Sequence, residues 1–150
     1  ALAAVRLLLP RRLQAQVGLS LDALNLKDAL AELKSYKNPP ENVRRVVVGV
    51  LCLLGHRLSG LTVWGQVQPH LKREMQRQML DFDAASQQSA EVPWKESRKA
   101  TEGLTSEEVQ KKGSLAVKTM LKWLEVNRLM RHEAVAAAVV KLATPPNAPE

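Results

Sequence analysis

The chain has 150 residues, of which 45% are apolar, 3% aromatic and 25% charged, with a formal net charge of +7. This length suits one domain with its own core and is too short for most two-domain arrangements. The positive charge points to an acidic partner: nucleic acid, an anionic membrane surface or a protein rich in carboxylates. No apolar run approaches the ~20 residues of a membrane span, and we expect no signal peptide because Pro10 breaks the first apolar run.

The composition predicts an all-α fold. Ala, Leu, Glu, Gln, Lys and Arg dominate, and these are the residues with the highest helix propensity. The single cysteine, Cys52, rules out a disulfide within the chain and suits a reducing compartment. We expect Cys52 to be a small buried apolar residue.

Residues 1–37 carry two apolar stripes that predict the first helix of a stalk. One stripe keeps the four-three spacing of a coiled-coil seam and consists of Leu19, Ala23, Leu26, Leu30 and Leu33. The other consists of Leu13, Val17, Leu21 and Leu24. The two stripes lie on nearly opposite sides of an ideal helix, so one partner helix cannot cover both. Because of Pro10 and Gly18, the first third can be read either as helix or as a poorly ordered end.

Two adjacent prolines, at positions 39 and 40, predict a corner between two helices. The first helix must stop by about Lys37, because proline lacks an amide hydrogen and its ring clashes with the preceding turn. We predict that Asn38 is the N-cap of the next helix and that Glu41, at its third position, completes a capping box. Apolar residues at three- and four-residue spacing then predict one wide buried face, and Gly55 is expected to end the helix. The predicted face consists of Val43, Val46, Val47, Val50, Leu51 and Leu54.

The middle of the chain predicts shorter elements. A connector at 55–64 leads to a helix that opens near Gln68 with Pro69 in its first turn and packs through Leu71, Met75, Met79 and Phe82. After a polar loop at 84–91, a short helix starts at 92–94 and closes at Gly103. Thr105 with Glu108 predicts the capping box of another short helix.

The last helix is predicted from about Ser114 to Leu142. Its inward side chains are expected to be Val117, Met120, Leu121, Trp123 and Leu124. From Leu129 onwards we expect it to lie along the first helix. The predicted organisation is therefore a stalk helix at 1–37, a helical bundle at 38–128, a returning stalk helix at 129–143 and a disordered tail at 144–150.

The pattern of polar residues does not predict an enzyme. His56, His70 and His132 are isolated in the sequence and lack carboxylate or cysteine neighbours at metal-ligand spacing. The sequence holds no glycine-rich phosphate loop, nucleophile elbow or paired-carboxylate arrangement. We expect no catalytic residue, no metal and no cofactor.

Two separated runs carry a resemblance to one family. Residues 33–55 (LKSYKNPPENVRRVVVGVLCLLG) resemble the junction between the first stalk helix and the first globular helix in the microtubule-binding domain of dynein heavy chains. Residues 114–129 (SLAVKTMLKWLEVNRL) resemble the last helix of that domain. Trp64 and the LDFD run at 80–83 are similar to the axonemal members. The two runs occur in the order that the family requires.

The resemblance implies a small helical bundle at the tip of an antiparallel two-helix coiled-coil stalk. This module binds α/β-tubulin without catalysis, and the register of the stalk helices controls its affinity. The parent motor is an ATPase whose ring lies far from the tip. The implied location is the cytoplasm and cytoskeleton, with the axoneme of a cilium or flagellum favoured, and a dynein light chain is a further candidate partner.

The resemblance also implies the residues that bind the microtubule. A basic residue in the place of Arg44 is typical of the family, and the first, third and last globular helices meet tubulin. The implied residues are Arg44, Arg45, Lys95, Arg98, Lys99, Lys122 and Arg128. Glu125 departs from the pattern, because many axonemal relatives are basic there. Alanines at 136–138 also replace charges that are common in the family.

Two other functions fit part of the sequence. A nucleic-acid-binding domain would explain the charge, but the basic residues are spread over three elements, and neither binding aromatics nor a zinc motif is present. A structural coiled-coil spacer would explain the ends and leave the core between Val43 and Leu124 unexplained. We therefore expect neither nucleic acid nor a membrane as partner.

Overall fold

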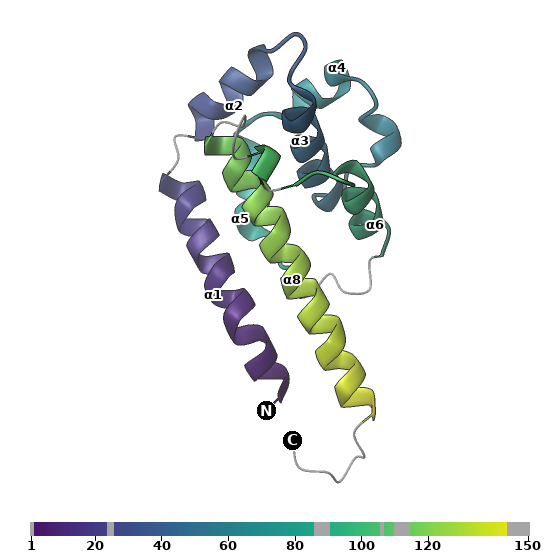
Figure 1. The fold of residues 1–150 in the computed structure, drawn as a ribbon. Helices are drawn as coiled ribbons and strands as arrows, with labels where there is room; N and C mark the ends of the chain where they lie inside the picture. The colour runs from purple at the N-terminus through teal and green to yellow at the C-terminus, as the bar shows by residue number, and fades with distance from the viewer. Residues whose placement is uncertain (1, 24–25, 86–90, 106, 110–114, 144–150) are drawn as a thin grey trace.

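The computed structural model describes residues 2–23, 26–85, 91–105, 107–109 and 115–143, with side chains in the same ranges apart from 2–7, 22–23, 26–27 and 137–143. Within these ranges the chain forms helices and connecting segments and no strand, which confirms the all-α class. Two long helices, α1 (Leu2–Ala23) and α8 (Leu115–Ala143), lie side by side and run in opposite directions. The other helices gather around the first half of α8 (Figure 1). None of the described helices is both long and apolar enough to cross a membrane.

The helix predicted to run to Lys37 is two helices. α1 continues through Pro10 and Gly18, and α2 (Leu26–Ser35) follows in a different direction (Figure 1). Residues 24–25, which include Leu24 of the second stripe, lie outside the described residues. Helix was predicted for both parts, and the prediction did not include their difference in direction.

The predicted coiled-coil seam is wrong at Leu19. This side chain is 71% exposed, whereas Val17 and Leu21, from the other stripe, are 5% and 1% exposed. The two stripes face nearly opposite directions on one helix, and α8 covers only one side of α1, so burial of the second stripe leaves Leu19 in solvent. Leu30 and Leu33 are buried, but they lie on α2, whose direction differs from that of α1. The side chains of Ala23 and Leu26 lie outside the described residues.

The corner at the two prolines starts α3 (Glu41–Leu53) later than predicted. The N-cap is Pro40, with φ −52° and ψ 145°, and its carbonyl accepts the first helical bond from the Arg44 amide at 3.1 Å. Asn38 is therefore not the cap. A residue before proline is pushed away from helical geometry, so Pro39 cannot begin the helix. Pro40 has the non-helical backbone of an N-cap.

The end of α3 is as predicted. Gly55 has φ +107°, a backbone conformation that residues other than glycine rarely adopt. The His56 amide donates to the Leu51 carbonyl at 3.0 Å and the Gly55 amide to the Cys52 carbonyl at 3.2 Å. These two bonds form a Schellman motif.

α3 is buried on all sides from Val46 to Leu53, beyond the single face that the spacing predicts. It packs against both α6 (Glu91–Ala100) and α8. The closest approach is at Gly49, where a Cβ would lie 2.9 Å from Thr101 Cγ2 and 3.3 Å from Leu124 Cδ1. The Ser97 hydroxyl donates to the Gly49 carbonyl at 2.8 Å. α3 is therefore the central helix of the bundle.

The helix predicted to open near Gln68 is divided. A turn η1 (Leu58–Gly60) and a short helix α4 (Trp64–Val67) come first, then η2 (Gln68–His70), which holds Pro69, and then α5 (Arg73–Asp81). The predicted apolar row still holds, since Leu71, Met75 and Met79 are each 2% exposed. The Trp64 indole donates to the Tyr36 carbonyl at 2.9 Å, which ties α4 to the end of α2.

Three aromatic rings join α5, α6 and α8. Phe82 lies 5.8 Å from Trp94 and 5.3 Å from Trp123 between ring centroids, and the Trp123 indole donates to the Met79 carbonyl at 3.1 Å. The predicted inward row of α8 is confirmed, because Val117, Met120, Leu121, Trp123 and Leu124 are all buried. The Thr105 hydroxyl accepts a bond from the Glu108 amide at 3.2 Å, as half of the predicted capping box requires. The proposed tail at 144–150 and most of the polar loop, 86–90, lie outside the described residues.

Candidate functional site

The two arginines at the start of α3 have different surroundings. Arg44 lies beside Glu41, with Nη2 2.6 Å from the carboxylate, and this hydrogen bond lowers the pKa of Glu41. Arg45 donates from Nε to the Ala100 carbonyl at 3.0 Å and from its terminal nitrogen to the Glu102 carbonyl. Because Ala100 is the last residue of α6 and Glu102 follows it, Arg45 caps that helix. The start of α3 and the end of α6 are thereby joined.

The remaining predicted residues lie on α6 and α8. Lys95, Arg98 and Lys99 are exposed on α6, and Lys122 is exposed on α8. Arg128 is only partly exposed. Four of the seven predicted cations therefore point into solvent on two neighbouring elements.

Arg128 links α8 to α6. Its Nη2 donates to the hydroxyl of Thr101 at 2.8 Å, to the Ser97 carbonyl at 3.2 Å and to the Ser97 hydroxyl at 3.3 Å. Burial lowers the pKa of Arg128, and the nearby positive charge of Arg98 lowers it further. The Arg128 Nε atom is buried and makes no hydrogen bond. The nearby charge of Glu125 opposes this lowering of the Arg128 pKa.

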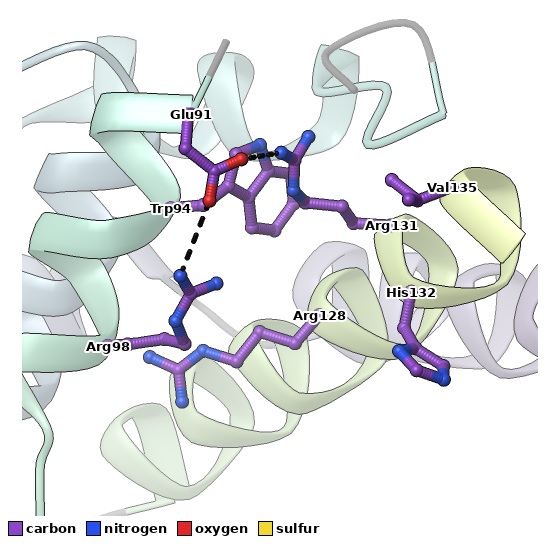
Figure 2. A pocket seen from close by; sticks show the side chains of 7 residues that line it. All are labelled: Glu91, Trp94, Arg98, Arg128, Arg131, His132 and Val135. Carbon is purple, nitrogen blue, oxygen red and sulfur yellow. Dashed lines mark hydrogen bonds and ion pairs between the residues drawn. The ribbon is translucent and has the colours of Figure 1, made fainter. Parts of the chain in front are cut away.

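A pocket of about 360 Å³ lies between α6 and α8, beside Arg128 (Figure 2). We call it the arginine pocket. Glu91, at the start of α6, places one carboxylate oxygen 2.5 Å from Arg131 Nη2 and the other 3.6 Å from Arg98 Nη2. The lining residues are Glu91, Trp94, Arg98, Arg128, Arg131, His132 and Val135.

Burial in the arginine pocket is uneven. The Arg131 side chain is 9% exposed and its guanidinium carbon lies 5.0 Å from the centroid of the Trp94 ring, within range of a cation–π interaction. The Glu91 side chain, by contrast, is 66% exposed. Packing on a buried indole therefore fixes Arg131, whereas Glu91 reaches the pocket from the solvent side.

Sequence reasoning did not find this pocket. The sequence around Arg131 gives no sign of burial, and the structure buries this side chain. Arg128, Arg131 and Val135 follow three- and four-residue spacing, which identifies one face of α8. That spacing alone is also typical of a solvated helix face. Only the crossing of α6 brings Glu91 and Trp94 to it.

The expectation that the histidines are isolated is wrong for two of them. The rings of His56 and His70 lie 4.0 Å apart between centroids, because the end of α3 meets η2. Burial lowers the pKa of His56, and the neighbouring His70 lowers it further. Among the described residues, no group of three or more His, Cys, Asp or Glu side chains could hold a metal ion.

Cys52 is fully buried, as expected. Burial raises the pKa of its thiol to about 11, and the charge of Glu96 contributes to the rise. Because the thiolate is the reactive form of cysteine, this side chain is unsuited to nucleophilic chemistry near neutral pH.

The chain belongs by its fold to the all-helical proteins, with a cation-rich surface on α6 and α8. Comparison with protein-family models, with curated proteins and with solved structures finds no match.

Proposed function

We propose that this chain is a microtubule-binding module of the dynein type, in which α1 and α8 form the end of a stalk and α3, α6 and the first half of α8 meet tubulin. The observation that supports this most strongly is the antiparallel pairing of α1 and α8, with a helical bundle at one end of the pair (Figure 1). The two runs that resemble the family, 33–55 and 114–129, contribute the corner before α3 and most of the first half of α8. The module acts without catalysis of its own, in the cytoskeleton and, by its axonemal features, in a cilium or flagellum.

The charge of the exposed residues supports the same proposal. Lys95, Lys99 and Lys122 are held in solvent by helices whose other faces are buried. Exposed positive charge attracts an acidic protein surface over roughly a Debye length, about 8 Å at physiological ionic strength. Binding should therefore weaken as salt is added.

Control of affinity through stalk register is part of the proposal. Leu19, which belongs to the stripe with four-three spacing, faces solvent on α1 and is therefore available to pair in another register. A register change can alter affinity only if the two registers differ in their affinity for the partner. A dynein light chain is a further candidate partner of the stalk.

Co-sedimentation with microtubules tests this function. We expect the double substitution Lys95→Glu and Lys99→Glu to weaken binding about tenfold or more, because reversing two rim charges turns attraction into repulsion and slows association. The matched control is Arg73→Glu with Arg77→Glu, which changes the net charge equally on exposed residues of α5. A gel shift with nonspecific DNA runs in parallel.

The outcomes separate the three functions. Binding to microtubules that the α6 substitutions remove and the α5 substitutions leave intact supports the proposal. Tight binding to DNA with weak binding to microtubules would favour the nucleic-acid alternative. Failure to bind either polymer would leave the spacer as the better interpretation.

A further inference from the structure

The arginine pocket gathers more positive than negative charge. Arg98, Arg128 and Arg131 line it together, and Glu91 is the one carboxylate among the seven lining residues (Figure 2). Burial and then the nearby charge of Arg98 lower the pKa of Arg128, whereas Glu125 raises it. The excess of guanidinium groups over carboxylates in the lining favours an anionic ligand.

The geometry selects a carboxylate. One carboxylate already lies between two guanidinium groups, and guanidinium donors match the planar carboxylate with two parallel bonds. Arg131 is ready for such a contact, because its packing on Trp94 holds the guanidinium in place before any ligand arrives. Trp94 and Val135 supply an apolar wall for the methylenes of an acidic side chain.

The resident carboxylate is bound closely by Arg131 and only loosely by Arg98. Glu91 and Arg98 are 66% and 52% exposed and their closest atoms are 3.6 Å apart, so this pair gains little from solvent-screened attraction. A rotation of the exposed Glu91 side chain would open the approach to Arg131 without disturbing the buried residues. An external carboxylate that took the same place would restore the bond to Arg131 that this rotation breaks.

We propose that the arginine pocket is a receptor for a glutamate or aspartate side chain from an acidic segment of a partner protein, which replaces Glu91 on Arg131 and Arg98. This proposal rests on the proposed function for its biological meaning. It adds the chemistry by which the partner would be recognised at one site. The pocket chemistry itself does not depend on which acidic protein supplies the carboxylate.

The test uses the full chain and a blocked peptide of alternating glutamate and glycine, titrated by calorimetry, beside the same peptide with glutamine in place of glutamate. We expect Glu91→Gln to tighten binding, because the competing resident is gone, and Arg98→Gln to weaken it about fivefold, the upper range for a partly exposed ion pair. Arg131→Lys keeps the positive charge but loses the paired donors of the guanidinium group, so it should weaken binding about tenfold. The indole resonance of Trp94 should shift as the peptide is added.

Two control variants separate the pocket from net charge. Arg77→Gln and Glu74→Gln, on the exposed surface of α5, make the same charge changes as Arg98→Gln and Glu91→Gln. The proposal is overturned if each control matches its pocket counterpart, or if the glutamine peptide binds equally well. Stronger competition by inorganic phosphate than by acetate would also overturn it, in favour of a phosphate site.

The helical signal and the melting temperature of Arg131→Lys are measured first. If Arg131→Lys unfolds, Arg98→Gln still tests the proposal, because it changes an exposed side chain. Microtubule co-sedimentation is scored separately. Peptide binding without microtubule binding would contradict the proposed function and leave the proposal for the arginine pocket standing. Microtubule binding without pocket-dependent peptide binding would contradict only the proposal for the pocket.

Discussion

Trp123 joins α8 to the last turn of α5. It is 3% exposed, packs against Phe82 and donates to the Met79 carbonyl in that turn. Its indole therefore serves both the apolar core and the hydrogen bonding of a helix end. Loss of the ring leaves a cavity and removes one of the two hydrogen bonds to the Met79 carbonyl, which also accepts from the Phe82 amide at 3.4 Å.

We expect Trp123→Ala to lower the free energy of unfolding by about 3–5 kcal/mol. That is a large part of the roughly 5–15 kcal/mol that stabilises a domain. Trp123→Phe, which keeps most of the volume and loses the hydrogen bond, should cost far less. The check is urea unfolding followed by circular dichroism, and an unchanged midpoint for the alanine variant would contradict the burial of this ring.

The His56–His70 pair predicts a pH dependence of stability. The pKa of His56 is lowered in the folded chain from its usual value of 6.5, first by burial and then by His70. Between the lowered value and 6.5 the unfolded chain therefore binds more protons, and stability falls as the pH drops through this window. Stability should be fully present above the unfolded pKa.

Urea unfolding at about pH 7.5 and pH 5.5, on either side of the unperturbed histidine pKa, measures this effect. His70→Gln removes the neighbouring charge and should reduce the loss at low pH, and His132→Gln, an exposed histidine on α8, is the control. Equal losses in all three proteins would show that the pair is not responsible.

Among the elements, α3 carries the close packing. Most of its surface is buried, and Gly49 permits α6 and α8 to approach it at one level. The Ser97 hydroxyl bonds the Gly49 carbonyl, and Arg128 bonds the Ser97 hydroxyl in turn. These bonds connect α3, α6 and α8 at one level and hold Arg128, which lines the arginine pocket.

We expect Gly49→Leu to destabilise the chain by about 1–3 kcal/mol or more, because the new side chain has no space beside Thr101 and Leu124. The matched control is Gly65→Leu in α4, where nothing lies within 4 Å of the added Cβ. Thermal melting of both variants gives the comparison. Similar melting temperatures would mean that α6 and α8 can move apart at this level.

At the scale of the whole molecule, α1 is held to α8 through one stripe and a polar contact. Gln14 Nε2 donates to Asn127 Oδ1 and to the Phe82 carbonyl, each at 3.4 Å, and Asn127 is fully buried. A buried polar contact in a helix pair favours one register over its neighbours. Leu19, on the opposite side of α1, is exposed and takes no part in this pairing.

Substitutions two residues apart should therefore differ sharply. We expect Val17→Asp to lower the melting temperature markedly, because an unpaired carboxylate would be buried between helices. Leu19→Asp should leave it nearly unchanged, because that side chain is exposed. If Leu19→Asp proves the more damaging, α1 uses the other stripe in solution and the register is different.

Local features of the sequence predicted much of the helical framework. The end of α3 at Gly55, the inward row of α8 from Val117 to Leu124 and the apolar row of α5 each depend on backbone limits or on spacing within a few turns. Such signals act between residues close in the chain, so composition and periodicity contain them. The same local reasoning misplaced the start of α3, because Pro40 pushes the backbone of Pro39 away from helical geometry.

The sequence by itself determined an all-helical chain with a proline corner, a glycine stop and a buried last helix. Only the tertiary structure decided that Leu19 faces solvent while Val17 is buried, that His56 meets His70, and that Glu91 reaches Arg131. The physical reason is that each of these outcomes depends on which distant helix comes to cover a given face. Residues 91 and 131 are brought together by the packing of α6 and α8, and no pattern within either helix specifies that contact.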